Sequence, residues 1–190
     1  LSKGDFILFL DADDWLYPDA VATQLRFFRR HPEAAFVAGS HDKVNDKKEI
    51  LPFAESPAPQ KDHFANLLLG NFIGMHAAVM YRRKLFDYFK YDIHLKACED
   101  YDLYLRVSRL YTIAVHCGKI AAYRLHQHNM SADTRLMMMH IRKVLKKQYD
   151  ILPIQDQYPL YKQGLKIWKS YYAVEAKRKR VMNAETALAL

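Results

Sequence analysis

The sequence predicts an α/β fold: a sheet with flanking helices, followed by a basic helical tail. An apolar run at residues 6–10 ends directly in a group of acids, and open α/β sheets bind ligands at strand ends of this kind. An amphipathic segment and a second apolar run come next, which gives the order strand, helix, strand. From residue 132 onward the apolar residues recur at helical spacing. We expect a body at residues 1–131 and a helical extension at residues 132–190.

The first half of the body is predicted to hold two strands and a helix. The continuous apolar run Phe6–Leu10 indicates a strand buried on both faces, as in a parallel sheet. Residues 20–30 form a helix that His31-Pro32 ends. The remaining expected elements, in chain order, are a strand at 35–38 ended by Gly39, a polar surface loop at 41–62, and a helix capped by Asp62 that runs to Leu69.

The second half is predicted to alternate short strands with longer helices. The expected elements are a strand at 76–81, a helical turn at 82–86, a helix at 99–110, and strands at 112–116 and 119–124. Cys117-Gly118 between the last two strands suggests a hairpin. In the tail, a helix from residue 132 is broken at Pro153, and a second helix spans residues 159–179.

Charge separates the tail from the body. The chain has 190 residues and a formal net charge of +8, and this excess lies entirely in residues 135–190. A neutral body with a basic tail indicates a local anionic contact rather than a nucleic-acid-binding protein. The tail helices either lie on an anionic membrane surface or pack their apolar faces on the body. No apolar run approaches the roughly 18 residues of a membrane span, and two cysteines indicate a reducing compartment.

Three acids follow the first strand, at Asp11, Asp13 and Asp14. Side chains alternate along an extended chain, so the first two point the same way and offer oxygen ligands to Mg²⁺ or Mn²⁺. The alternative is that the acids only cap the next helix. A haloacid-dehalogenase phosphatase would need Thr or Val where Trp15 stands, and a calcium-binding EF-hand would need a glycine where Leu16 stands.

Two later segments carry further candidates. Glu99 and Asp100 stand at a helix start, where the helix dipole favours ionised carboxylates, although acids there can simply be N-caps. The segment 123–131 offers Arg124 as a phosphate ligand and His126 as a metal ligand. A single histidine taken alone is more often structural than a metal ligand.

Together these segments resemble family 2 glycosyltransferases, which are inverting enzymes with the GT-A fold. The resemblance rests on four segments in order across residues 4–131: GDFILFLDADDW at 4–15, NFIG at 71–74 with MYRRKLF at 80–86, EDYDLYLR at 99–106, and YRLH at 123–126 with Asn129 and Ser131. Each motif is weak alone, and their order and spacing make the match specific.

The resemblance implies roles for seven residues. Asp11, Asp13 and Arg124 would bind the nucleotide-sugar donor, Asp13 and His126 would hold Mn²⁺ or Mg²⁺, Glu99 and Trp15 would bind the acceptor, and Asp100 would be the general base. It implies a glycan or lipid-linked acceptor in surface polysaccharide or glycolipid synthesis. The enzyme would be cytoplasmic, at the cytoplasmic face of the membrane if the tail contacts lipid, and nucleic acid is not an expected partner.

The resemblance also has a gap, because the family's nucleotide-binding βαβ unit precedes the acidic strand and these residues do not contain it. The chain begins at Leu1, so we expect it to start inside a larger protein and to form the C-terminal half of the catalytic domain. We expect an uncovered sheet edge beside Phe6–Leu10 and little donor binding or turnover by these residues alone. Two other readings stay open: a metal-dependent phosphatase or nucleotidyltransferase, and a non-enzymatic module that binds membrane or nucleic acid.

Overall fold

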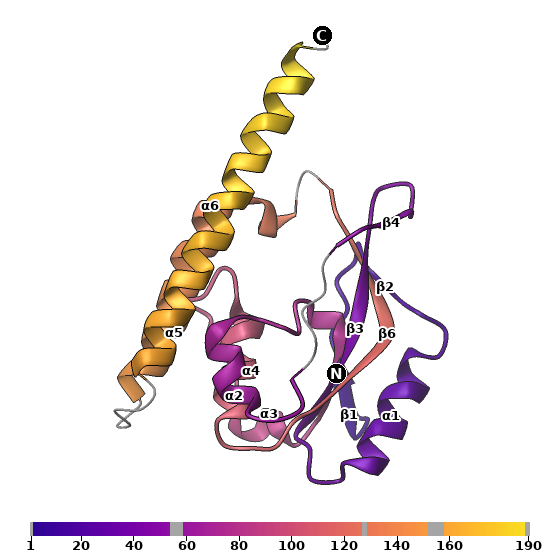
Figure 1. The fold of residues 1–190 in the computed structure, drawn as a ribbon. Helices are drawn as coiled ribbons and strands as arrows, with labels where there is room; N and C mark the ends of the chain where they lie inside the picture. Colours follow the sequence, from indigo (N-terminus) through magenta and orange to yellow (C-terminus); the bar gives the residue numbers. More distant parts are fainter. Residues whose placement is uncertain (1, 54–58, 127–128, 152–157, 189–190) are drawn as a thin grey trace.

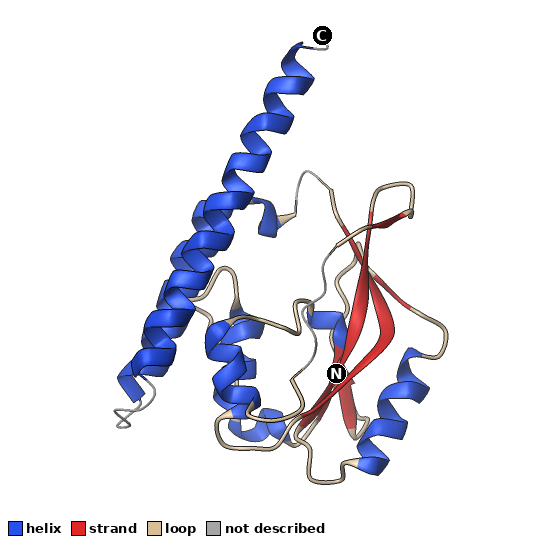
Figure 2. Cartoon of the chain, viewed as in Figure 1, coloured by secondary structure: helices blue, strands red, loops and turns tan. Residues whose placement is uncertain are grey.

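The structure, a computed structural model, describes residues 2–53, 59–126, 129–151 and 158–188. The elements form layers (Figures 1 and 2): helix α1 covers one face of a sheet, helices α2, α3 and α4 lie on the other side, and the long helices α5 and α6 form an outer layer. The predicted α/β class with a helical extension is confirmed.

The sheet has six strands in the order β1-β5-β3-β6-β2, with β4 paired to one end of β3. The strands are β1 Phe6–Leu8, β2 Trp15–Leu16, β3 Phe36–Val44, β4 Ile50–Leu51, β5 Val79–Arg82 and β6 Ala114–Arg124. The pair β3 and β6 is parallel, and the other pairs are antiparallel. The sheet is therefore mixed.

Six α-helices and two 3₁₀ turns complete the described residues. The helices are α1 Ala20–Arg30, α2 His63–Leu69, α3 Leu85–Tyr88, α4 Glu99–Ser108, α5 Thr134–Ile151 and α6 Tyr158–Leu188; the 3₁₀ turns are η1 His76–Ala78 and η2 Met130–Ala132. The helices were expected near these positions. The break expected at Pro153 lies outside the described residues.

The prediction for the first strand was wrong in direction and burial. β1 is antiparallel to β5, and its three side chains are only partly buried. Phe6 and Leu8 pack against the cluster around Phe28, while the following Phe9 joins a different cluster. The run is apolar because it contacts two clusters, and this pattern carries no information on strand direction. Within the described sheet β1 is an edge strand, as expected.

The predicted loop at residues 41–62 was placed too early in the chain. Strand β3 continues to Val44, and β4 then returns antiparallel to it. Gly39 does not end the strand but lies inside it. A Cβ atom at Gly39 would approach atoms of His116 and Ile120 within 2.9 Å. Glycine is therefore needed at this position for close packing rather than for a turn.

The predicted hairpin around Cys117-Gly118 was also wrong. Residues 114–124 form one strand, β6, which runs parallel to β3 with register irregularities on either side of Ser40. At this irregular region the His116 ring accepts a hydrogen bond from the Gly118 amide at 3.1 Å. Glycine in a strand pattern marks a bulge as readily as a turn.

Two smaller expectations also differ. Residues 76–78 form the 3₁₀ turn η1 rather than the start of a strand. Asp62 precedes α2, but its backbone is left-handed and its side chain makes no capping hydrogen bond. Its carbonyl oxygen instead accepts hydrogen bonds from the backbone amide and the side-chain amide of Asn66.

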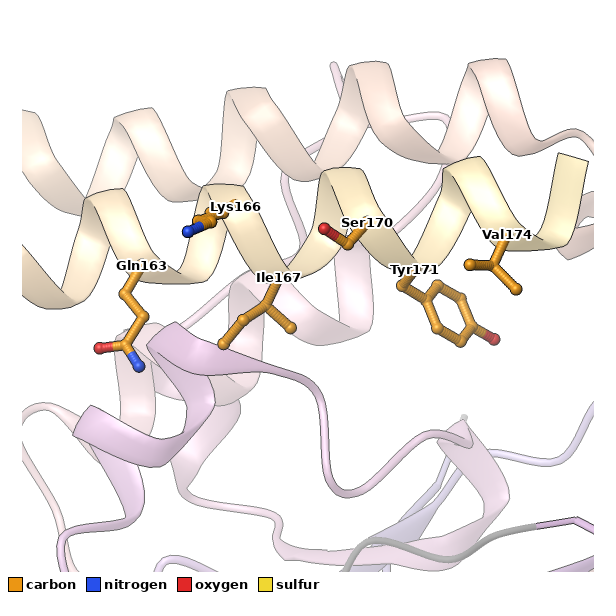
Figure 3. A pocket seen from close by; sticks show the side chains of 6 residues that line it. All are labelled: Gln163, Lys166, Ile167, Ser170, Tyr171 and Val174. Carbon is orange, nitrogen blue, oxygen red and sulfur yellow. The ribbon is translucent and has the colours of Figure 1, made fainter.

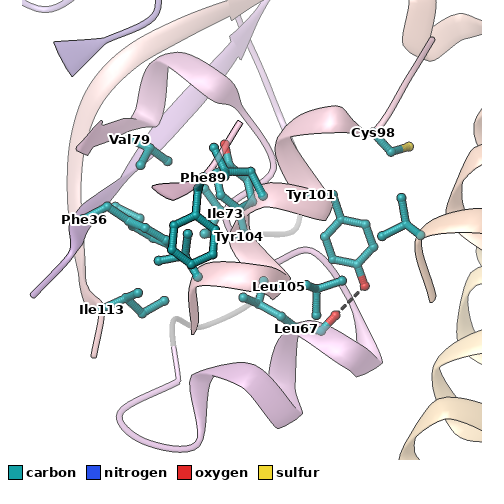
Figure 4. Packing of buried hydrophobic residues seen from close by; sticks show 14 of the residues in the cluster. Phe36, Leu67, Ile73, Val79, Phe89, Cys98, Tyr101, Tyr104, Leu105 and Ile113 are labelled. Carbon is teal, nitrogen blue, oxygen red and sulfur yellow. Dashed lines mark hydrogen bonds between the residues drawn. The ribbon is translucent and has the colours of Figure 1, made fainter. Parts of the chain in front are cut away.

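The main core lies between the sheet and the helices and includes the extension (Figure 4). Tyr101 of α4 is buried there and donates a hydrogen bond to the Leu67 carbonyl of α2. Ile141, Val144 and Leu145 of α5 are buried in the same cluster, and Leu165, Trp168 and Tyr172 of α6 pack against it. The division at residue 132 stays a prediction, although both parts share this core. Among the described helices, none has the length and apolar character needed to span a membrane.

Candidate active site

The acidic segment after β1 meets the segment after β6. The carboxylate oxygen Oδ2 of Asp13 lies 2.7 Å from Nε2 of His126, although 113 residues separate them. Both side chains are partly exposed, at 31 % for Asp13 and 23 % for His126. The hydrogen bond with His126 lowers the pKa of Asp13, and the charges of His126 and Arg124 lower it further. The pair therefore presents an ionised carboxylate and an imidazole to solvent.

Asp14 joins the same two segments through the backbone. Its Oδ1 accepts a hydrogen bond from the Arg124 amide at 2.9 Å. Burial raises the pKa of Asp14 to about 6, and the charges of Asp13 and Asp11 act in the same direction. The capping explanation for these acids does not describe the structure, because α1 has Asp19 at its N-cap and no side-chain capping bond.

The Asn129 side chain binds the backbone at the end of β6 and just after it. Its side-chain oxygen accepts the backbone N–H of His126, and its amide donates to the Arg124 carbonyl at 3.1 Å. The hydroxyl groups of Tyr123 and Ser131 lie 2.7 Å apart on the same segment. These contacts give the YRxHxxNxS pattern a physical reason, since Asn129 fixes the backbone that carries the arginine and the histidine. His128 of this pattern lies outside the described residues.

Arg124 is a candidate anion ligand in this group. Its Nε atom is buried and makes no hydrogen bond in the described part of the chain. The guanidinium charge helps to lower the pKa of Asp13 and opposes part of the rise in the pKa of Asp14. A buried N–H group without an acceptor is costly, so an incoming phosphate oxygen would be favoured there.

A second group forms around Asp100, at the first turn of α4. Burial raises the pKa of Asp100 to about 6; its Oδ1 accepts the Tyr101 amide at 2.6 Å, and the charge of Asp11 raises the pKa further. Glu99 lies beside it on the same turn. The structure thus links Asp11 electrostatically with Asp100, and Asp13 with His126. The segment 11–13 connects the two groups.

His76 belongs to this second group, and the sequence analysis did not select it. Its Nε2 lies 2.6 Å from the Tyr91 hydroxyl, and its ring stacks on Phe9 with 4.8 Å between centroids. Burial lowers its pKa, while the charges of Asp11 and Glu99 raise it. The available signal was a histidine at the start of an otherwise apolar segment, two residues after the NFIG pattern.

Trp15 follows Asp14 directly along the chain. It lies in β2 and pairs with Ala122 of β6. The ammonium group of Lys48 lies 5.5 Å from the centre of its ring, a cation–π distance. Its expected role in acceptor binding stays a prediction.

The candidate metal ligands are two side chains, Asp13 and His126. In the described ranges no three His, Cys, Asp or Glu side chains are grouped as metal ligands. Asp13 and His126 offer one oxygen and one nitrogen donor at adjacent positions, a combination that suits Mn²⁺ or Mg²⁺ only if a substrate or water completes the coordination. The residues therefore fit a cation shared with the donor diphosphate.

A separate hollow of about 620 Å³ lies along α6 (Figure 3). Its lining comes from one stripe of the helix: Gln163, Lys166, Ile167, Ser170, Tyr171 and Val174. None of these is a predicted site residue, and no carboxylate is among them. We therefore assign the chemistry to the two carboxylate groups rather than to this hollow.

Comparison with known proteins defines the class. A crystal structure of S. aureus TarS 1-349 in complex with UDP-GlcNAc matches with a TM-score of 0.53 and 12 % identity over 88 % of this chain and 57 % of that chain. The fold is thus of the GT-A glycosyltransferase type, and the chain spans little more than half of that structure. Residues 1–89 match the model of glycosyl transferase family 2. The first 89 of the 190 residues are thus similar to glycosyl transferase family 2. No curated protein matches its sequence significantly.

Proposed function

We propose that this chain supplies the catalytic carboxylate and the diphosphate-binding residues of an inverting glycosyltransferase that transfers a sugar from a nucleotide-sugar to an acceptor hydroxyl. The observation that carries the proposal is the contact between Asp13 and His126, with Arg124 beside it. The link from Asp11 to Asp100 supports it further. One segment thus connects a group suited to a leaving diphosphate with a group suited to a base.

Asp100 acts as the general base in this proposal. A pKa of about 6 leaves the carboxylate ionised at pH 7 while keeping its basicity closer to the working pH than that of an ordinary aspartate. It accepts the proton of the acceptor hydroxyl as the acceptor oxygen bonds to the anomeric carbon. The bond from that carbon to the diphosphate breaks on the opposite face, so the configuration inverts.

The leaving diphosphate is bound by the group of Asp13, His126 and Arg124. Arg124 offers a guanidinium that can bind phosphate oxygens in a bidentate manner. Asp13 and His126 would hold a divalent cation, which when bound supplies Lewis-acid stabilisation of the departing diphosphate. Asp14 and Asn129 keep the backbone of Arg124 in place.

Two variants of the full-length natural protein test the proposal. Asp100→Asn and Asp13→Ala are both expected to lose nearly all transfer, and Asp13→Ala is also expected to lose metal-dependent donor binding. The exposed Asp87 of α3 provides the control Asp87→Asn, which should keep wild-type activity. UDP-GlcNAc is the first donor to test, since the TarS structure contains it.

The readouts are product formation, calorimetric titration with UDP and Mn²⁺, and the anomeric configuration of the product by NMR. A product that retains the donor configuration contradicts the inverting reaction. Release of phosphate without sugar transfer favours a phosphatase instead. Unchanged function in both variants favours a non-enzymatic module.

Contact with an anionic membrane surface is part of the same proposal, together with a lipid-linked acceptor and a location at the cytoplasmic face. Its support is the set of exposed cations on α6, namely Lys162, Lys166, Lys169, Lys177 and Arg178. Removing the extension is unsuitable as a test, because α5 contributes to the main core. The double change Lys166→Gln and Lys169→Gln should weaken binding to phosphatidylserine vesicles roughly 30-fold. The control is the double variant Lys84→Gln and Lys96→Gln. If the α6 variant co-sediments with the vesicles as much as this control does, the result contradicts membrane contact.

A further inference from the structure

We propose that His76 is an acceptor-binding residue whose imidazole Nδ1 hydrogen-bonds a hydroxyl group of the sugar or polyol acceptor beside Asp100. The inference rests on the proposed function and specifies its acceptor side. Three features support it: the ring is fixed, one ring nitrogen is open, and the surroundings are those of the general base.

The ring of His76 is held from two sides. Phe9 stacks against it with an interplanar angle of 26°, and the Tyr91 ring meets it nearly edge-on at 5.5 Å between centroids. The Tyr91 hydroxyl lies 2.6 Å from Nε2. Phe9 is itself packed among Tyr81, Phe86 and Tyr91. Such support fixes the direction in which the second ring nitrogen points.

The second ring nitrogen, Nδ1, is available to a ligand. Among the described residues it makes no hydrogen bond, and it is not one of the buried side-chain atoms that lack a partner. It is therefore not fully buried, and solvent reaches it at least in part. Burial keeps the pKa of His76 low, so the ring is neutral at pH 7. A neutral imidazole either donates or accepts at Nδ1 according to its tautomer, and a hydroxyl group satisfies both cases.

The position of His76 favours the acceptor over the donor. Glu99, which lies beside Asp100 on α4, acts on the ring of His76, and the charges of Asp100 and Glu99 both raise the pKa of Tyr91, whose hydroxyl is bonded to Nε2 of His76. The diphosphate side, by contrast, is built from Asp13, Arg124 and His126. An acceptor hydroxyl must lie within hydrogen-bond reach of its base, so polar groups that surround Asp100 contact the acceptor first.

Two substitutions separate a binding role from a structural one. His76→Gln can place its amide near the former Nε2 and keep the bond to Tyr91, but it removes the Nδ1 group. His76→Asn can place its amide near the former Nδ1 and loses the bond to Tyr91. The exposed His94, whose backbone amide rather than its ring donates a hydrogen bond to Asp92, provides the control His94→Gln.

The assay measures transfer by the full-length natural protein from its nucleotide-sugar to methyl β-D-glucoside, methyl N-acetyl-β-D-glucosaminide and glycerol. His76→Gln should raise the acceptor KM about 3- to 10-fold, the loss of one hydrogen bond, with the donor KM within about twofold. His76→Asn should lie closer to the wild type, and thermal unfolding should show that both variants fold.

The outcomes are distinguishable. A wild-type acceptor KM in His76→Gln, with His76→Asn impaired, assigns His76 a purely structural role and overturns the inference alone. Equal rises in the donor and acceptor KM also overturn it. A wild-type protein that transfers to none of the probes from any common nucleotide-sugar overturns the proposed function itself.

Discussion

Replacing Asp100 by Asn is expected to stabilise the protein at neutral pH while it removes transfer activity. Burial raises the pKa of Asp100 from 3.8 to about 6, so the folded protein holds this proton more tightly than the unfolded chain does. The ionised carboxylate at pH 7 therefore lowers the free energy of unfolding. A difference of about two pKa units corresponds to about 3 kcal/mol. Asp100 is only partly buried as a residue, so part of this cost is screened and we expect about 1–2 kcal/mol.

The shape of the site should change little in this variant. The side-chain carbonyl of Asn can accept the Tyr101 amide in place of the carboxylate. The loss of charge also removes repulsion from Asp11, which contributes to the raised pKa. The expected gain is therefore electrostatic, and it must depend on pH.

Thermal unfolding of wild type and Asp100→Asn between pH 7 and pH 4 provides the assay. The stability penalty of a raised acid pKa is absent below the unfolded value and complete above the folded value. The advantage of the variant should therefore be full at pH 7 and disappear between about pH 6 and pH 4. Transfer by the wild type should fall over the same range as the base becomes protonated.

Two results would refute this reasoning. No gain at pH 7 would mean that the carboxylate is not desolvated in the folded protein. A gain that persists unchanged at pH 4 would mean that packing rather than charge causes it. The exposed Asp87→Asn control should show no gain at either pH.

The remaining predictions concern backbone support and packing. Asn129→Ala removes two hydrogen bonds of the segment after β6 and should weaken metal-dependent UDP binding about 10-fold by calorimetry; unchanged affinity contradicts the positioning role. Asp14→Ala should weaken it similarly, whereas Asp14→Asn keeps an acceptor for the Arg124 amide and should bind more tightly than Asp14→Ala. Gly164→Ala places a Cβ 2.0 Å from a carbonyl oxygen of α2, so unfolding should show a loss of about 1–3 kcal/mol. Gly70→Ala, with open space around it, is the control, and equal stability of the two contradicts the predicted overlap.

Local patterns were sufficient for the helices and the general class. The apolar residues of α1, α4, α5 and α6 repeat at helical spacing, and such spacing depends only on the nearby sequence. The same holds for the acids after β1, since a group of acids directly after an apolar run can be recognised within about ten residues of sequence. The assignment to a glycosyltransferase family likewise followed from short motifs in a fixed order.

Strand direction and partners needed the tertiary structure. Phe6–Leu8 is antiparallel and lies at an edge, and residues 114–124 form one strand, because an apolar pattern records burial and not the neighbour that provides it. Gly39 marks close packing with His116 and Ile120 rather than a strand end. Each of these facts depends on residues far away in the chain.

The site shows the same division. The sequence alone determined which side chains have the chemistry of ligands and bases, because that chemistry belongs to the residue type. Only the tertiary structure decided that Asp13 meets His126 across 113 residues, that Asp100 is desolvated, and that His76 is bonded to Tyr91 near Glu99 and Asp11. Contacts and burial are properties of the folded path of the chain, and a local pattern cannot encode them.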